Sequence, residues 1–190
     1  MAGEQLHILV VCTANQCRSP LAAAALVAQA ADRSHLIDVT SAGIQAVDGM
    51  PATPPTVDAA RRMGLDISAH ASRPLVRAEV QGADLILGLE RRHIQEIVLL
   101  EPPAFVRTYT LKEFVRRGQD VGPRAHDETV ADWLARLHDG RRPMDLLGAS
   151  LDDDVADPTG SSAVDHRTTA DEVNHLAEAA LELLVPADAE

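Results

Sequence analysis

The chain is poor in aromatic residues, cysteine and lysine. Of its 190 residues four are aromatic and two are cysteine, and Lys112 is its single lysine. Two cysteines cannot form a disulfide framework, and they are too few for a thiolate metal site without histidine or carboxylate ligands. No metal ion or organic cofactor is expected.

The sequence also lacks a long apolar run and an excess of basic residues. No stretch approaches the roughly 20 apolar residues that span a bilayer, and the first five residues do not resemble a secretory signal. The net charge of −12 disfavours nucleic acid and anionic membranes as partners, because both require a basic surface. We therefore expect a cytoplasmic protein without a nucleic-acid or membrane partner.

Short apolar runs alternate with helical patterns over much of the chain. The alternation predicts an α/β fold, a single Rossmann-like three-layer domain with a four-stranded parallel sheet and helices on both faces. Strands are predicted at 6–11, 37–40, 83–87 and 105–108, and helices at about 20–31, 56–63, 90–100 and 111–117. A capping box at Thr169–Glu172 predicts the start of a last amphipathic helix.

The alternation fails over residues 119–154, where acidic residues accumulate. Residues 119–157 hold ten Asp or Glu and four Arg. A helix is predicted at about 127–138, between turns that contain glycine and proline. We interpret 119–154 as an acidic insertion in one domain that spans residues 1–190.

One octapeptide carries chemistry: Cys12-Thr13-Ala14-Asn15-Gln16-Cys17-Arg18-Ser19, between the first strand and a helix begun by Pro20. A loop at a helix N-terminus aims backbone N–H groups inward and binds an oxyanion. A thiol at its base is stabilised as the nucleophilic thiolate, Arg18 can bind two phosphoryl oxygens with its fork, and Ser19 can donate to the sulfur. The pattern predicts a nucleophile and an anion clamp in one loop.

A structural role is the alternative for this loop. Cys12 would then be a buried inert residue and Arg18 a solvated helix residue, which is common for a lone cysteine. Arginine and serine at these two offsets arise by chance roughly once in a few hundred cysteines, given ordinary composition. The spacing, the strand before it and the proline after it favour the functional interpretation.

On these residues the chain resembles the low-molecular-weight protein-tyrosine phosphatase family, as a bacterial member. The family signature Cys-x-x-Asn-x-Cys-Arg-Ser-Pro is matched by residues 12–20. The likeness continues over 41–43, 64–73, 83–93 and 110–114, and resumes at Asp157-Pro158 and the final helix. It covers most of the chain apart from about 119–152.

The resemblance implies a hydrolase that forms a phosphocysteine intermediate. Cys12 would be the nucleophile, Arg18 the phosphate clamp, and Ser19 the group that stabilises the leaving thiolate. Thr13, Ala14, Asn15, Gln16, Cys17, Arg18 and Ser19 would bind phosphate. A network of Asn15, Ser19, Ser41 and His70 would hold the loop in shape. The substrate would be a phosphorylated protein, foremost on tyrosine, or a small phosphomonoester.

Departure of an alkoxide or aryl oxide needs a general acid, and the following hydrolysis needs a base. One carboxyl group can serve both steps in turn. The residues alone leave Asp154 and Asp157 open, since Asp-Pro is a common turn pair. The resemblance implies Asp157, because the family's catalytic acid precedes a proline.

The second cysteine has two interpretations. The resemblance implies that Cys17 could form a reversible disulfide with Cys12 that shields the nucleophile from over-oxidation. Alternatively, Cys17 is a small packed residue behind the loop. Separation and geometry of the two residues decide between them.

The sequence departs from the family at the walls of the substrate slot. Thr159 and Gly160 stand where tyrosines usually follow the Asp-Pro, and Ala46 and Val47 stand near another aromatic wall. We expect a wider slot that is less suited to stacking a phenyl ring. One hypothesis is that Trp133, Leu134 and Leu137 form a helix at the mouth that replaces the missing wall. A solvated surface insertion is the alternative.

Two further functions remain open at this stage. An arsenate reductase of the same fold, coupled to a small thiol, shares the loop. The thioredoxin-coupled form is disfavoured because the chain has no cysteine beyond Cys17. A phosphate-binding module without turnover is the other alternative, disfavoured because nucleophile, clamp, serine and acid are all present.

Overall fold

The computed structural model describes residues 5–30 and 36–185. The chain start up to residue 4 and the predicted helix end at Ala31 lie outside these ranges. Within them, four parallel strands form one sheet in the order β2-β1-β3-β4. Their bounds are β1 Leu6–Cys12, β2 Ile37–Gly43, β3 Leu85–Gly88 and β4 Thr108–Thr110. The predicted fold class is confirmed.

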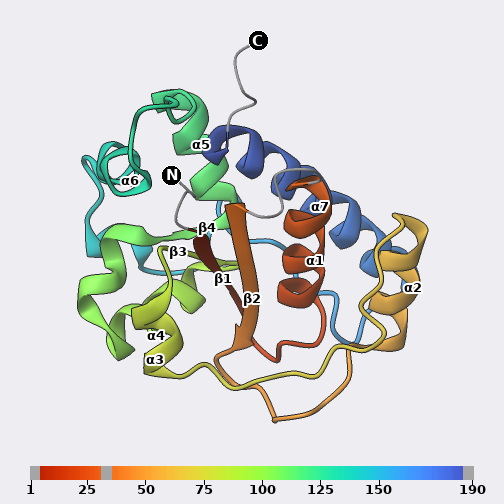
Figure 1. Cartoon of the computed structure of the whole chain (residues 1–190). Coiled ribbons are helices and arrows are strands. Elements are labelled where there is room, and N and C mark those ends of the chain that lie inside the picture. Colours follow the sequence, from red (N-terminus) through yellow and green to blue (C-terminus); the bar gives the residue numbers. More distant parts are fainter. Residues whose placement is uncertain (1–4, 31–35, 186–190) are drawn as a thin grey trace.

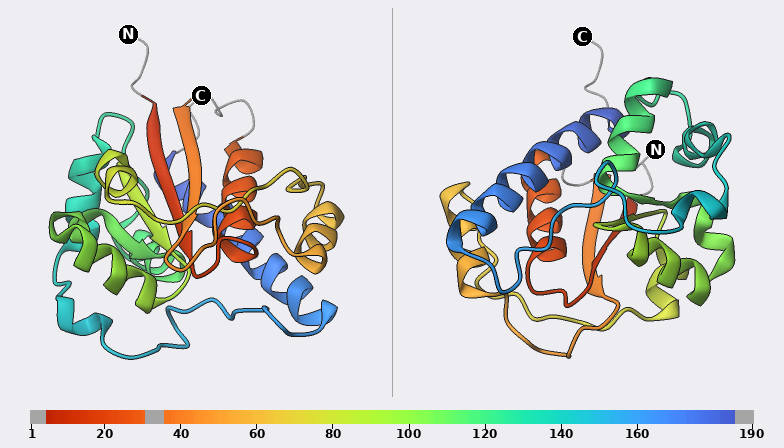
Figure 2. Two further views of the ribbon diagram at one scale, coloured as in Figure 1. Left: turned by 90° about the horizontal axis from the view of Figure 1, so that it is seen from below. Right: turned by 180° about the vertical axis from the view of Figure 1, so that it is seen from behind.

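Helices cover both faces of this sheet (Figures 1 and 2). The α-helices are α1 Arg18–Ala30, α2 Pro54–Arg62, α3 Arg77–Gly82, α4 Arg91–Leu100, α5 Leu111–Val121, α6 Val130–His138 and α7 Ala163–Leu184. Two 3₁₀ turns, η2 Pro102–Arg107 and η3 Pro143–Leu146, join them. None of the described helices is both long and apolar enough to cross a membrane.

The two faces of β1 belong to two separate apolar clusters. Ile8 and Val10 pack in the larger cluster with residues of α1, α5 and α7. Leu9 and Val11 pack in the smaller one with residues of α3, α4 and η2. Successive side chains of a strand point to opposite faces, and burial on both explains the continuous apolar run.

The predicted strand at 105–108 is wrong. Residues 102–107 form the 3₁₀ turn η2, and β4 begins at Thr108. The reason is Pro102-Pro103, because proline fixes φ and cannot donate to a ladder. Thr108 then closes the turn by donating its hydroxyl to the Ala104 carbonyl at 2.8 Å.

Glycine does not stop α5 where the sequence indicated. The helix continues through Gly118 to Val121 and ends at Gly122, whose φ is 88°. A Cβ on Gly118 would lie 2.7 Å from Leu183 Cδ1 of α7. The glycine therefore permits close packing of two helices.

The last helix begins earlier than its predicted capping box. Ser162 accepts from the Asp165 amide at 3.3 Å and Asp165 accepts from the Ser162 amide at 3.0 Å, which makes Ser162 the N-cap of α7. Thr169 lies inside the helix and is buried. Two stretches fit the same capping pattern, and the earlier one begins the helix. The short helix α3 was not predicted.

Helix α6, within residues 119–154, packs into the core of the sheet domain. Trp133, Leu134 and Leu137 of α6 are buried in the larger cluster, and the Trp133 ring lies edge-on to Phe114 at 5.5 Å between centroids. Helix α6 lies at the end of the sheet where β1 begins, away from Cys12 (Figure 1). The hypothesis that these residues form a wall at the mouth is therefore wrong.

Candidate active site

Cys12 lies at the carboxyl end of β1, at the base of a tight loop. β1 ends at Cys12 and α1 begins at Arg18, so five residues connect strand to helix. The Cys12 Sγ accepts hydrogen bonds from the Asn15 backbone amide at 3.2 Å and from the Ser19 hydroxyl at 3.0 Å. Two hydrogen-bond donors therefore point at this one sulfur.

Asn15 holds the loop in an unusual conformation. Its φ of 55° is the left-handed region, which costs a residue with a Cβ roughly 1–2 kcal/mol. The buried side-chain amide donates to Ser19 Oγ at 2.8 Å and to Ser41 Oγ at 2.9 Å. Its carbonyl oxygen Oδ1 accepts from the Arg73 amide at 2.8 Å. His70 Nε2 lies 2.7 Å from the Asn15 backbone carbonyl. The structure thus brings Asn15, Ser19, Ser41 and His70 together.

Gly43 was missed as a contributor to this loop. β1 and β2 pair Cys12 with Gly43. A Cβ at Gly43 would lie 2.6 Å from the Thr13 carbonyl oxygen and 2.8 Å from the Asn15 amide. Only glycine permits this approach, and a glycine at the end of a strand was the available signal.

Arg18 is buried, and its guanidinium is surrounded by acceptors. Nη1 donates to Glu90 and to the Val155 carbonyl at 2.9 Å. Nη2 donates to Asp157 Oδ2 at 2.6 Å. The side chain of Asp157 is 34% exposed, against 1% for Arg18. The other Asp157 oxygen accepts from the Thr159 amide at 3.0 Å, which fixes the carboxylate at the edge of the site.

The structure separates the two aspartates that the sequence left open. Asp154 accepts from the backbone amides of Arg91 and Ser150, at 2.8 and 2.9 Å. Its carboxylate thus fastens the segment to α4. Asp157 is the aspartate that contacts Arg18.

Glu90 and His93 join the site and were missed as functional residues. Glu90 pairs with Arg18 and also accepts from Arg92 Nε at 2.7 Å. Both residues belong to the charged run 90–93, which begins two residues after β3 ends, at the edge of the sheet where ligands bind in open α/β folds. That position was the signal that could have identified them.

His93 is an uncharged support for the loop. Its Nδ1 accepts from the Leu89 and Glu90 amides, at 3.2 and 3.0 Å. The proton therefore lies on Nε2, 3.1 Å from Thr13 Oγ1. Burial, reinforced by the charges of Arg18 and Arg92, lowers the pKa of His93 to about 2. The ring stays neutral at any ordinary pH.

Cys17 lies buried between two threonine side chains. Both cysteines are free and buried, and Cys17 Sγ lies 3.3 Å from Thr53 Oγ1 and 3.7 Å from Thr159 Oγ1. The disulfide between Cys12 and Cys17 stays a prediction. Thr159 and Val47 are exposed.

No aromatic residue stands at the predicted slot walls. All four aromatic residues of the chain fall in the described part of it. Tyr109, Phe114 and Trp133 are buried in the core, and Phe105 packs against His138. Positions 46–47 and 159–160 carry no ring, so stacking against an aryl group has no partner there.

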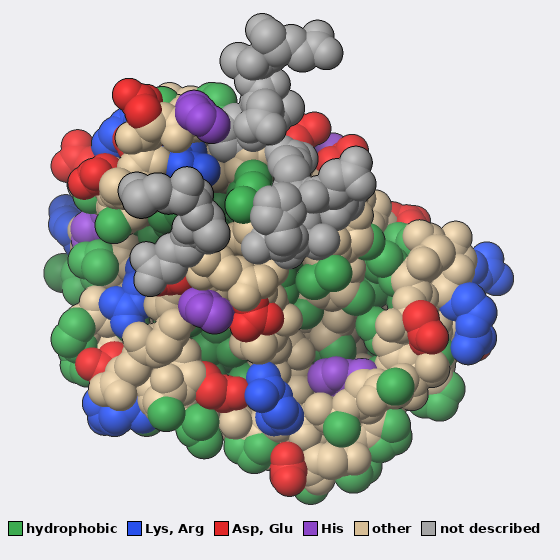
Figure 3. All heavy atoms as spheres, viewed as in Figure 1, with side chains coloured by type: hydrophobic (Ala, Val, Ile, Leu, Met, Phe, Trp, Pro, Cys, Tyr) green, Lys and Arg blue, Asp and Glu red, His purple; other side chains and the backbone are tan. Residues whose placement is uncertain are grey.

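The face of the molecule viewed in Figure 1 carries no dominant charge. Basic side chains lie singly or in small groups among acidic and apolar ones (Figure 3). At the loop 12–19 of this protein of net charge −12, anion binding would draw on the loop amides and Arg18.

Known proteins resemble this chain over most of its length. A sequence profile described as low molecular weight phosphotyrosine protein phosphatase matches residues 7–127. A probable low molecular weight protein-tyrosine-phosphatase, EpsP of Ralstonia solanacearum, is 46% identical over 133 residues, which are 70% of this chain and 89% of the relative. A protein-arginine-phosphatase of Bacillus subtilis is 37% identical over 111 residues, 58% of this chain and 73% of that protein.

The fold is shared with a solved structure. A crystal structure of a low molecular weight protein tyrosine phosphatase from T. tengcongensis superposes with a TM-score of 0.72 at 28% identity. The superposition covers 95% of this chain and 100% of that one.

Proposed function

The chain belongs to the low molecular weight phosphotyrosine protein phosphatase family, and from that membership we propose that it dephosphorylates proteins through a phosphocysteine on Cys12. It is a phosphoric monoester hydrolase of the protein-tyrosine-phosphatase type. The observation that carries the proposal is the Cys12 sulfur, which receives hydrogen bonds from Ser19 and the Asn15 amide.

In the first step the Cys12 thiolate attacks phosphorus. The loop amides and the Arg18 fork bind the phosphoryl oxygens, where charge develops in the transition state. As the S–P bond forms and the P–O bond breaks, Asp157 gives its proton to the departing oxygen. Glu90 orients Arg18 from the opposite side of the guanidinium.

In the second step water hydrolyses phosphocysteine. The Asp157 carboxylate, ionised by the first step, takes a proton from the attacking water, and phosphate leaves as the S–P bond breaks. The Ser19 hydroxyl stabilises the thiolate that is released. The site returns to its initial protonation state.

Phosphotyrosine on proteins is the first candidate substrate, since the family and relatives such as EpsP carry that name. Small phosphomonoesters would use the same chemistry.

Phosphoarginine on proteins is a second candidate. A relative 37% identical is named a protein-arginine-phosphatase. The observation on this chain that favours it is the slot without aromatic walls at 46–47 and 159–160, since a guanidinium needs no ring stacking. In that case Asp157 would protonate the departing guanidine nitrogen and an N–P bond would break.

The test is steady-state hydrolysis of an aryl phosphate and of phosphoarginine by the wild type, Cys12→Ser, and the matched control Cys17→Ser. We expect Cys12→Ser to lose turnover of both substrates yet bind phosphate, and Cys17→Ser to retain turnover. Normal turnover by Cys12→Ser would show that the nucleophile is assigned wrongly.

The same preparations separate the arsenate alternative. Consumption of arsenate with a small thiol, in place of phosphate release, would favour a reductase. The ratio of kcat/KM for the two phosphorylated substrates decides between tyrosine and arginine.

A further inference from the structure

A second charged cavity lies on a different flank of the molecule. It has a volume of about 210 Å³ and is enclosed by α4, α5 and residues 141–153 of the insertion. It shares no lining residue with the loop 12–19. Its basic lining residues are Arg91, Arg116, Arg117, Arg141 and Arg142.

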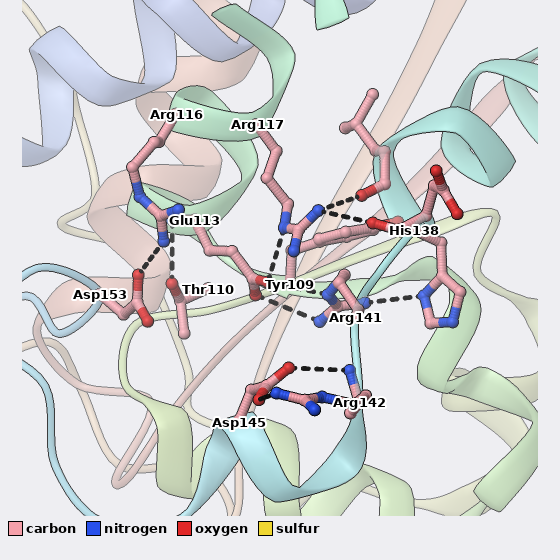
Figure 4. A network of polar contacts seen from close by, with 12 residues as sticks. Tyr109, Thr110, Glu113, Arg116, Arg117, His138, Arg141, Arg142, Asp145 and Asp153 are labelled. Atoms are coloured by element: carbon pink, nitrogen blue, oxygen red, sulfur yellow. Dashed lines mark hydrogen bonds and ion pairs between the residues drawn. The ribbon is translucent and has the colours of Figure 1, made fainter. Parts of the chain in front are cut away.

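Carboxylates in this cavity neutralise only part of that charge. Glu113 accepts from Arg117 Nε at 3.2 Å and from Arg141 Nε at 2.8 Å. Its side chain is 11% exposed. One buried carboxylate therefore serves two guanidinium groups, as Figure 4 shows, and one positive charge remains.

Asp153 repeats this arrangement on the other side of the cavity. It accepts from Arg91 Nη2 at 2.7 Å and from Arg116 Nη2 at 2.6 Å, and its side chain is 7% exposed. Burial raises the pKa of Asp153, but hydrogen bonds from Arg116 and Arg91 outweigh it and keep the pKa below its usual value. The carboxylate is thus charged, and a second positive charge remains.

The charge of the fifth arginine, Arg142, is neutralised by an aspartate. Arg142 pairs with Asp145 at 3.2 Å (Figure 4). Five arginines and three acids leave the cavity with a formal charge of +2, inside a protein of net charge −12. A concave site whose lining carries an excess of two positive charges favours an anion of matching charge.

The arginines differ in what they can offer. The donors of Arg141 are used within the fold, because it donates to Glu113 and to the carbonyls of Phe105 and Thr108. The Arg116 side chain is 51% exposed and, within the described residues, donates to Asp153 alone. Arg91 uses Nε and Nη2 on the same carboxylate, which leaves its Nη1. Arg116 and Arg91 therefore keep N–H donors that could bind a ligand.

We propose that this cavity binds a phosphate dianion, as inorganic phosphate or as the phosphoryl group of a small organic molecule. Arg116, Arg91 and Arg142 would hold the phosphoryl oxygens, since the guanidinium fork suits their geometry. Arg141 and Arg117 would supply fixed positive potential behind them. The site is separate from the proposed catalytic loop and does not depend on it.

An NMR titration of the ¹⁵N-labelled full chain with inorganic phosphate tests both sites at once. We expect saturable shifts of amides in 113–117 and 141–146, separate from those in 13–19. Arg116→Gln should weaken the first set by about tenfold or more, because a hydrogen bond to a charged group is lost. It should leave the second set unchanged.

The matched control is Arg136→Gln, which removes a half-exposed arginine paired with Glu128 outside the cavity. It should alter neither set. If Arg116→Gln does not fold, Arg142→Gln takes its place, because Arg142 is 76% exposed. The expected results are the same.

Absence of saturable shifts at 113–117 and 141–146, or an affinity there that Arg116→Gln does not change, would overturn the proposal. The same shifts produced by chloride at matched ionic strength would also overturn it. Shifts confined to 113–117 and 141–146 would support it while contradicting the proposed catalytic loop. Tighter binding of propylphosphonate than of phosphate would identify an organic phosphoryl ligand. Equal or weaker binding of propylphosphonate would identify inorganic phosphate as the ligand.

Discussion

Arg18 Nη2 and Asp157 Oδ2 lie 2.6 Å apart, so the proposed phosphate clamp and the proposed general acid share a hydrogen bond. The same guanidinium also contacts Glu90. A phosphoryl group that binds Arg18 must compete with the Asp157 carboxylate. Binding of phosphate would release Asp157 from Arg18, and the freed side chain, once it has taken up a proton, would serve as the acid toward the leaving group. This coupling leads to the first prediction.

Asp157→Asn should lower kcat on aryl phosphates by about 10²–10⁴-fold, the usual contribution of a general acid or base. Phosphate should still bind at least as well, because the amide competes less for Arg18. The measurement is kcat for leaving groups of increasing basicity, together with phosphate inhibition. The loss should grow with basicity. Asp154→Asn is the control, and an equal loss there would contradict the assignment of Asp157.

Two substitutions at Asn15 separate its backbone conformation from its hydrogen bonds. Asn15→Gly tolerates the φ of 55° but leaves Ser19 and Ser41 without their partner, at a cost of about 1–3 kcal/mol. Asn15→Ala loses the same bonds and adds roughly 1 kcal/mol of strain. The check is the free energy of unfolding from urea titration. Equal stability of the two variants would show that the left-handed conformation is not strained.

His93 should make stability fall in acid. Its pKa is lowered to about 2 in the folded protein, against about 6.5 when unfolded. The folded state therefore binds fewer protons, and its stability is complete above pH 6.5 and is lost as the pH falls from 6.5 toward 2. The slope contributed by one such group is up to about 1.4 kcal/mol per pH unit.

His93→Asn should flatten this pH dependence, since its Oδ1 can still accept from the Leu89 and Glu90 amides. The free energy of unfolding between pH 7 and 4 is the measurement. His175→Asn, on the exposed face of α7, should keep the wild-type slope. An unchanged slope in His93→Asn would contradict the neutral buried ring.

Gly118→Ala should destabilise the protein by about 1 kcal/mol, because an overpacking cost of about 1–3 kcal/mol is partly offset by about 1 kcal/mol of helix propensity. The added Cβ meets Leu183 Cδ1 at 2.7 Å. Gly82→Ala is the control, because a Cβ there meets open space and is expected to be neutral or to stabilise by about 0.4–1 kcal/mol. Thermal unfolding measures both.

A Leu183→Ala substitution should restore part of the loss from Gly118→Ala in a double-mutant cycle. Additive effects of the two changes would mean that α5 and α7 do not meet at this contact.

Local patterns were enough for the strand, loop and helix that carry Cys12. The apolar run of β1, the octapeptide 12–19 and Pro20 are contiguous, and each signal acts within a few residues. The same holds for the α/β fold class, which follows from alternating elements. Boundaries failed where two local signals competed, as at Pro102-Pro103 and at the two capping boxes before and within α7.

Contacts between distant residues required the tertiary structure. Asp157 is 139 positions from Arg18 and Glu90 is 72, and no local pattern ranks Asp157 above Asp154 or marks Glu90. The sequence indicated that α5 ends before Gly118. The reason for a glycine there, close packing against Leu183, could not be seen locally because Leu183 lies on another helix.

The sequence by itself thus predicted the loop chemistry that we propose for Cys12, because the proposed nucleophile, the proposed clamp and the backbone donors belong to one short segment. The tertiary structure decided which carboxylates surround Arg18, where the insertion packs, and that five arginines line one cavity. Those features depend on side chains that only chain folding brings within a few ångströms of each other.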